Sequence, residues 1–237
     1  MPRLSELLQR AGVGGAIAPA QDVLITDITA DSRQAKAGSV YVAVRGVHSN
    51  GEDYIADAIA RGAHAVVTEA ANVTADVPVL QVADARAAIS ALADALYPQQ
   101  PEHLFAITGT DGKTSTADFL RQLSGMLGHK AASVGTLGLR SPIERLNAQF
   151  PAINTSPEPV LLRRILSSLA DAGVTHAAIE ASSHGLDQKR LDGLRFSAAA
   201  FTNLTRDHLD FTAPWKPTLQ PRRACSRPCC PSPALQC

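Results

Sequence analysis

The sequence predicts an α/β protein in two parts: a small N-terminal α/β domain, then a domain built on a mostly parallel sheet. Short apolar runs alternate with helical patterns along the chain, which is typical of parallel strands with helices on both faces. A proline-containing break, Pro98-Gln-Gln-Pro101, separates the parts, and a glycine-rich turn follows the next strand. We therefore expect domains over residues 1–100 and 101–211.

The N-terminal part opens with a short amphipathic helix within residues 1–10, carried by Leu4, Leu7 and Leu8. Alternating or apolar runs then predict strands over residues 22–28, 39–44, 65–68 and 77–82. Residues 54–61 read as a helix that ends at Gly62. An alanine-rich helix follows over residues 84–97, with Asp84 as its N-cap.

The second part repeats strand and helix. An apolar run at 105–107 enters the turn Gly109–Gly112, and a helix follows to about residue 127. Further strands are expected at 131–136, 176–180 and 198–202, with a helix at 159–172. The strand at 176–180 delivers Ala181-Ser-Ser-His184. Because ligands bind at the carboxyl ends of parallel strands, the site should lie at this edge of the sheet.

The turn is the stretch with the clearest chemistry. A strand, a glycine-rich loop and a helix N-terminus direct backbone N–H groups toward one spot, which suits phosphate. The loop is a shorter variant of the usual pattern, since position 107 is Ile where that pattern has glycine. Lys113 would reach the outer phosphates of ATP. The expected nucleotide contacts are Gly109, Thr110, Asp111, Gly112, Lys113, Thr114 and Ser115.

A magnesium ion is the expected cofactor. Phosphoryl transfer requires positioned phosphates and a metal that neutralises developing charge. Mg²⁺ prefers oxygen ligands, which the Thr114 hydroxyl and the Glu180 carboxylate supply. His208 is a softer ligand that follows the last predicted strand. We expect Thr114, Glu180 and His208 to hold metal, and Lys113, Glu180 and His208 to be catalytic.

Composition restricts the partners. The 237 residues are 45% hydrophobic and carry no net charge, so neither nucleic acid nor a membrane is indicated. No stretch approaches the ~18 apolar residues that span a bilayer, and the N-terminus does not resemble a signal peptide. We expect a cytoplasmic monomer that acts on small molecules.

The last 26 residues differ from the rest. Residues 212–237 contain all four Cys, six of the fifteen Pro and four basic residues without an acidic one, whereas residues 1–211 have 18 basic and 22 acidic residues. No helical or strand period runs through this tail. Its cysteine spacing fits no zinc pattern and no His lies among them. We expect the tail to be disordered.

Three motifs together give a resemblance. They are Gly109-Thr-Asp-Gly-Lys-Thr-Ser115, Glu180-Ala-Ser-Ser-His-Gly-Leu-Asp-Gln-Lys-Arg190 and Phe201-Thr-Asn-Leu-Thr-Arg-Asp-His-Leu-Asp210, and Asp31-Ser-Arg33 is a fourth, shorter one. With this order and spacing, residues 20–211 resemble the Mur ligase family. Asp111 stands where the family often has Asn.

The resemblance implies an ATP-dependent ligase of peptidoglycan synthesis. Such an enzyme phosphorylates the D-Glu carboxylate of UDP-N-acetylmuramoyl-L-alanyl-D-glutamate, and the amine of an amino acid, here expected to be meso-diaminopimelate, attacks the acyl phosphate. The implied uridine-nucleotide contacts are Ala30, Ser32, Val47, His48 and Ser49. The implied muramoyl-peptide contacts are Asn154, Thr155, Ser156, Ser182, Gln188 and Arg190. The guanidinium of Arg190 suits carboxylates and phosphates.

The sequence departs from the family after Phe211. The family continues with a helix containing Ala-Lys, whose carbamylated lysine binds a second Mg²⁺, and with a third domain that receives the amino acid. When the tail is written with permitted codons and one base is added, the shifted frame can encode such a helix. We infer a single-base deletion near Thr212, which resequencing tests. We expect the 237-residue chain to bind ligands weakly without completing ligation.

Other functions are compatible with parts of the sequence. A folylpolyglutamate synthase has a similar phosphate loop but lacks the uridine-nucleotide domain and the Ser-Ser-His-Gly-Leu-Asp-Gln stretch. A non-catalytic nucleotide-binding remnant agrees with the unusual tail. An unrelated P-loop ATPase would hydrolyse ATP regardless of the UDP-linked precursor.

Overall fold

The computed structural model describes residues 1–15, 17–46, 49–150 and 155–205. The expected tail, with its Cys and Pro residues, lies outside these ranges. The described chain divides into two compact units after Pro98, within the break Pro98–Pro101. Among the described residues, no helix combines the length and apolar character that a membrane crossing requires.

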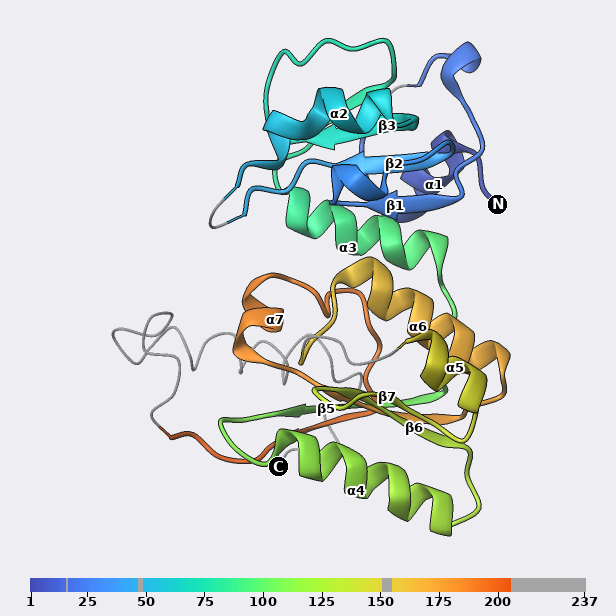
Figure 1. Cartoon of the computed structure of the whole chain (residues 1–237), viewed down its shortest axis with the longest axis vertical. Helices are drawn as coiled ribbons and strands as arrows, with labels where there is room; N and C mark the ends of the chain where they lie inside the picture. The colour runs from blue at the N-terminus through green and yellow to red at the C-terminus, as the bar shows by residue number, and fades with distance from the viewer. Residues whose placement is uncertain (16, 47–48, 151–154, 206–237) are drawn as a thin grey trace. The chain divides into compact units, whose positions relative to one another are not determined.

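The first unit is built on a parallel four-stranded sheet of order β1-β2-β3-β4 (Figure 1). One face is covered by α2 and the opposite face by α3, against which α1 lies. The elements are α1 (Leu4–Ala11), β1 (Asp27–Thr29), β2 (Ser39–Val42), α2 (Ile55–Ala60), β3 (Ala63–Thr68), β4 (Val79–Gln81) and α3 (Ala85–Leu96), with short 3-10 helices at Pro19–Gln21, Ser32–Gln34 and Gly51–Tyr54. Asp84 caps α3, accepting from the N–H of Ala87 at 2.9 Å.

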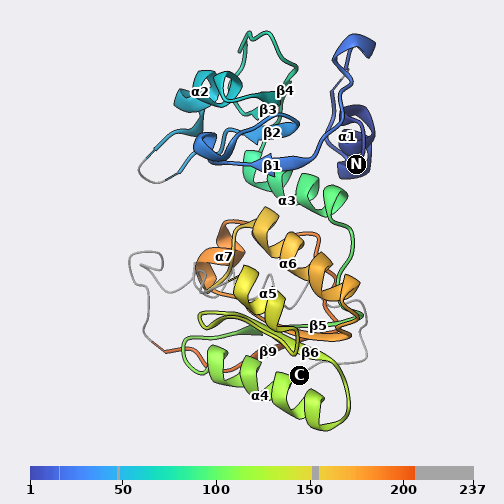
Figure 2. The same cartoon turned by 45° about the vertical axis from the view of Figure 1, so that its right-hand side comes forward.

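The second unit has a five-stranded sheet of order β7-β6-β8-β5-β9, parallel except for the β6–β7 hairpin. Figure 2 shows α4 on one face of this sheet and α5 and α6 on the other. The elements are β5 (His103–Thr108), α4 (Lys113–Met126), β6 (Ala131–Gly135), β7 (Gly138–Arg140), α5 (Glu144–Gln149), α6 (Pro159–Asp171), β8 (His176–Glu180), α7 (Ser183–Asp187) and β9 (Ala198–Phe201).

The core of the second unit lies between the sheet and α6. Leu162, Ile165, Leu166 and Leu169 of α6 are fully buried at the i, i+3, i+4, i+7 spacing of one helix face. They pack on alternate side chains of the strands, such as Leu104 of β5. This core holds the strands in register, so that their carboxyl ends lie along one edge.

The α/β class and the mostly parallel sheets are confirmed. One expectation about an element is wrong. The strand expected at 22–28 is regular only from Asp27, because the main chain before it pairs with the N-terminus: Leu24 forms a bridge with Arg3, and Ile25 N–H donates to the Pro2 carbonyl at 3.0 Å. The short helix α7 after β8, to which the sequence assigned no element, has Ser182 as its N-cap, whose hydroxyl accepts from Gly185 N–H at 3.0 Å.

Candidate functional site

The loop at residues 109–115, predicted to bind phosphate and called the phosphate loop below, lies at the carboxyl end of β5 and leads into α4. Gly112, at φ +81°, turns the chain into the helix, whose first turn presents its N–H groups to the loop. Gly112 has no side chain with which to cap them. Lys113 curls back over the loop, and its ammonium donates to the carbonyls of Gly109 at 2.9 Å and Thr110 at 2.7 Å.

The loop is fixed by the segment that follows β9. Asp111 N–H donates to Asn203 Oδ1 at 2.9 Å, and Thr110 N–H donates to the carbonyl of Asn203 at 3.0 Å. The Thr202 hydroxyl donates to the Asp111 carbonyl at 2.6 Å. Gly109 is required here, because a Cβ at this position would overlap the Thr202 side chain. Since β9 pairs with β5, two segments some ninety residues apart form one loop structure.

Glu180 is the central carboxylate of the site. It ends β8, beside β5, and is only 2% exposed. Its Oε2 accepts from the Thr114 hydroxyl at 2.9 Å and its Oε1 from the N–H of Thr136 at 2.9 Å. A buried charge needs hydrogen-bond partners, and these bonds supply them. Thr136 was not among the residues predicted from the sequence, although it follows directly after a parallel strand.

The donor set fits Mg²⁺. The side chains of Thr114 and Glu180 offer only oxygen atoms as ligands. Because the Thr114 hydroxyl donates its hydrogen to Glu180, the lone pairs of the Thr114 oxygen can bind a cation. Mg²⁺ keeps several waters, so few protein ligands suffice. In the described part of the chain no group of three or more His, Cys, Asp or Glu side chains could hold a metal. His208, the third expected ligand, lies outside that part.

A second cluster adjoins Glu180 and contains the described residues expected to contact the muramoyl peptide. The Ser156 hydroxyl, 1% exposed, donates to the Glu180 carbonyl at 2.8 Å and lies 2.9 Å from the Ser182 hydroxyl. Arg190 donates to the Ser156 carbonyl at 2.6 Å and to Gln188 Oε1 at 2.7 and 3.0 Å. Thr155 lies 3.1 Å from the Thr136 hydroxyl. Asn154 lies outside the described residues.

Ser115, the last of the expected nucleotide contacts, is exposed in the first turn of α4. The structure thus brings the loop at 109–115, Glu180 and the cluster of Thr155, Ser156, Ser182, Gln188 and Arg190 together. The loop and Glu180 lie at the carboxyl ends of parallel strands, where ligands are expected to bind.

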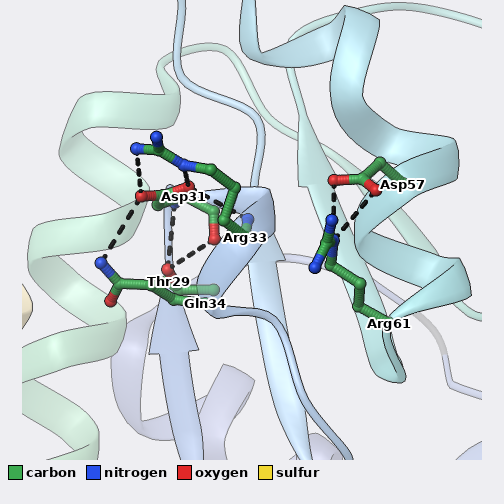
Figure 3. Close-up of polar contacts among 6 residues, drawn as sticks. All are labelled: Thr29, Asp31, Arg33, Gln34, Asp57 and Arg61. Atoms are coloured by element: carbon green, nitrogen blue, oxygen red, sulfur yellow. Dashed lines mark hydrogen bonds and ion pairs between the residues drawn. The ribbon is translucent and has the colours of Figure 1, made fainter.

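In the first unit the Asp31-Ser-Arg33 turn lies at the carboxyl end of β1 (Figure 3). Asp31 accepts from the backbone and side chain of Arg33, at 3.0 and 2.8 Å to Oδ1 and 2.8 Å to Oδ2. The Arg33 hydrogen bond holds the pKa of Asp31 below its usual value. Thr29 closes the turn by accepting from Asp31 N–H at 3.0 Å.

Ser32, the middle residue of this turn, is buried, with 6% of its surface exposed. Its hydroxyl donates to Asp57, and this bond, with that from Arg61, keeps the pKa of Asp57 low. Figure 3 shows Arg61 directed at the Asp57 carboxylate, with both oxygens 3.0 Å from Nε. Ala30, partly buried, precedes the turn, and Ser49, exposed, lies in the loop after β2. Val47 and His48 lie outside the described residues.

Known proteins resemble both units. Residues 24–97 match the model of the Mur ligase family, catalytic domain, and residues 107–215 match the Mur ligase middle domain. The UDP-N-acetylmuramoyl-L-alanyl-D-glutamate--2,6-diaminopimelate ligase of Agrobacterium fabrum is 53% identical over 187 residues, 79% of this chain and 37% of that protein. The protein of that name from Brucella melitensis is 46% identical over 210 residues, 87% of this chain and 42% of that protein.

A solved structure of a ligase with the same name is 25% identical in sequence, with a TM-score of 0.76, and the match covers 92% of this chain and 44% of that one. The chain therefore spans about two fifths of the length of the curated relatives it matches, between 37% and 42%. The resemblance drawn from the sequence motifs is confirmed by both family models. The chain belongs to the Mur ligase family, of which it carries the matched N-terminal and middle domains.

Proposed function

We propose that the chain is the nucleotide- and precursor-binding portion of an ATP-dependent ligase, one that joins 2,6-diaminopimelate to UDP-N-acetylmuramoyl-L-alanyl-D-glutamate. The observation that carries the proposal is the hydrogen bond between Thr114 and Glu180, 2.9 Å long, beside the Ser156–Arg190 cluster. It supports a phosphate-and-metal site next to a polar cluster suited to an acidic substrate. The names of the curated relatives supply the substrate.

The reaction consists of two transfers. The D-Glu carboxylate attacks the terminal phosphorus of ATP, and ADP leaves with the electrons of the broken P–O bond. The amine of the amino acid then attacks the acyl carbon, loses a proton and expels phosphate. Lys113 would neutralise the transferred phosphoryl group as a point charge. Arg190 would orient an anionic group of the precursor with its planar guanidinium.

Mg²⁺, held by Thr114 and Glu180, would neutralise charge on the phosphate oxygens when bound. We propose that His208 joins the metal site and that the loop at Gly109–Ser115 binds ATP. We also propose that Ala30, Ser32 and the Val47-His48-Ser49 loop hold the uridine nucleotide, while Asn154, Thr155, Ser156, Ser182, Gln188 and Arg190 hold the muramoyl peptide. We also propose a cytoplasmic monomer that serves cell-wall synthesis.

Calorimetric titration of the chain with Mg·ADP tests the nucleotide site. We expect Lys113→Ala to weaken binding by roughly a hundredfold, because a lysine contact to phosphate is a charge-assisted hydrogen bond. Lys130→Ala is the matched control, since Lys130 is exposed beyond the far end of α4 and should leave the affinity unchanged. Equal loss in both variants would contradict the assignment of the loop.

The ligase reaction is tested by mass spectrometry of mixtures containing the chain, ATP, the UDP-linked precursor and diaminopimelate or lysine. Product that depends on all three substrates establishes amide-bond formation. ATP hydrolysis that is indifferent to the precursor would instead indicate an unrelated P-loop ATPase. Binding of ADP and UDP without product would indicate a chain that binds but does not ligate.

A further inference from the structure

Thr136 touches both parts of the site. It follows β6, and its backbone and side chain both contact Glu180: N–H donates to Oε1 at 2.9 Å, and the hydroxyl donates to Oε2 at 3.2 Å. The same hydroxyl lies 3.1 Å from that of Thr155. Thr136 therefore stands between the carboxylate of the proposed metal site and the loop of the proposed precursor site.

The direction of these hydrogen bonds can be assigned from the number of hydrogens. A hydroxyl has one hydrogen to donate and two lone pairs. The Thr136 hydroxyl donates its one hydrogen to Glu180 Oε2. The hydroxyl of Thr155 must then donate to Thr136. The result is a directed chain from Thr155 through Thr136 to Glu180.

The carboxylate of Glu180 accepts three hydrogen bonds, one from Thr114 and two from Thr136. Oε2 accepts from Thr114 and Thr136, and Oε1 accepts from the Thr136 N–H. Gly135 allows this approach, because a Cβ there would overlap Glu180 Oε1. Three hydrogen bonds to the two oxygens fix the plane of the carboxylate. Without them, the carboxylate could rotate about the last side-chain torsion of the glutamate.

The precursor loop is attached to the same residue. Ser156 donates to the Glu180 carbonyl at 2.8 Å, while its neighbour Thr155 reaches the Glu180 side chain through Thr136. The main chain and the side chain of Glu180 are therefore both linked to residues 155–156. Rotation of the carboxylate would break the hydrogen bond from the Thr136 hydroxyl, and with it the connection from Glu180 to Thr155.

We propose that Thr136 is a positioning residue that orients the Glu180 carboxylate for the cation and couples it to the Thr155–Ser156 loop. The proposal rests on the proposed function, since it presumes that Glu180 serves a Mg·nucleotide site. It goes beyond that function by assigning a task to a residue that is neither in the phosphate loop nor among the expected precursor contacts. Precursor bound at Thr155 would thereby act on the metal site.

The test measures the affinity of the chain for ADP over a series of Mg²⁺ concentrations, by calorimetry. Thr136→Val keeps the backbone N–H and the side-chain shape but removes the hydroxyl. We expect it to need about tenfold more Mg²⁺ for the same gain in ADP affinity, while the affinity without Mg²⁺ stays unchanged. Thr136→Ser retains the hydroxyl and should stay within about twofold of the unchanged chain.

Thr175→Val is the matched control. Thr175 directly precedes β8, at the amino end of the strand that Glu180 ends, so its hydroxyl is remote from the site. Circular dichroism melting of each variant verifies that it is folded. A merely structural role for Thr136 would lower the melting temperature and leave the Mg²⁺ dependence intact.

The outcomes separate the two proposals. A shifted Mg²⁺ dependence in Thr136→Val alone supports the positioning role. An unshifted dependence in that variant overturns the role and leaves the nucleotide site standing. If the unchanged chain binds no ADP at any Mg²⁺ concentration, the nucleotide site fails and the role of Thr136 fails with it.

Discussion

Gly135 and Gly125, both in the second unit, differ in the space that is available for a side chain. A Cβ on Gly135 would overlap Glu180 Oε1, whereas a Cβ on Gly125, in the last turn of α4, would have nothing within 4 Å. The first glycine makes room for a buried carboxylate, and the second has no such neighbour. The same substitution should therefore have opposite effects at the two positions.

We expect Gly135→Ala to lower the free energy of unfolding by about 1–3 kcal/mol, because Glu180 would be forced off its hydrogen bonds in a packed site. We expect Gly125→Ala to raise it by about 0.5–1 kcal/mol, because alanine loses less backbone entropy in a helix. Urea denaturation measures both. Equal destabilisation by the two variants would contradict the position of Glu180.

Some site residues could be found from the sequence and others could not. Lys113, Thr114 and Glu180 were predictable because they lie in a loop motif or at the end of an apolar strand. Thr136 follows a strand in the same way and could have been found by that signal. Asn203 could not, because its contact with Asp111 depends on β9 pairing directly with β5.

Three histidines gather at the amino ends of the strands of the second unit. His176 of β8 stacks on His129, with ring centroids 4.2 Å apart, and lies 4.6 Å from His103 of β5. Burial, then the charges of His129 and His103, holds the pKa of His176 below its usual value, with Glu102 acting in the opposite sense. His176 also meets Thr175, whose hydroxyl is 2.9 Å from Nδ1.

This cluster makes stability depend on pH. Because the folded-state pKa of His176 is lowered, the unfolded chain binds more protons as the pH falls below about 6.5. The contribution of the neutral His176 to the free energy of unfolding should therefore be fully present above that pH. Below it, the loss due to His176 should have a slope of at most about 1.4 kcal/mol per pH unit, until the folded-state pKa is passed.

Urea denaturation at several pH values between 5 and 8 measures this slope. His176→Phe keeps a ring in the stack and removes the titration, so its slope between pH 5 and 6.5 should be shallower than that of the unchanged chain. Above pH 7 the two chains should have parallel dependences, which serves as the internal control. An unchanged slope in the variant would show that other groups cause the loss.

At the scale of elements, segments with a clearly repeating buried face were the most predictable. The helix at Pro159–Asp171 was expected within one residue, because its buried face repeats clearly. The three-residue strand β7 and the six-residue helix α5 were not expected. The strand expected from Asp22 is regular only from Asp27, because Leu24 and Ile25 pair with Arg3 and Pro2 at the N-terminus and not with β2.

At the scale of the whole molecule, the first unit has the features of an independent domain. Among the described residues, its four strands pair with one another, and the cluster around Tyr41 and Val66 consists of residues of that unit. Tyr41 donates to the Gly51 carbonyl at 2.8 Å, and burial raises its pKa to about 12. A buried, hydrogen-bonded tyrosine of this kind marks a well-packed core.

We expect a fragment ending at Pro98 to fold by itself, because a core of this size suffices for a domain of about a hundred residues. Far-ultraviolet circular dichroism and a single cooperative urea transition test this. The tyrosine titration adds a readout: part of the absorbance change should be delayed to about pH 12. A fragment with a broad, non-cooperative transition would show that the unit depends on the rest of the chain.

The attachment of the phosphate loop to the segment after β9 has a consequence for synthesis. Residues 109–112 leave the ribosome long before Thr202 and Asn203, which hold the loop through Thr110 and Asp111. The nascent chain therefore carries an unfinished phosphate loop until some ninety further residues have been translated. Competence to bind nucleotide should appear late and abruptly, when β9 adds to β5 and completes the loop.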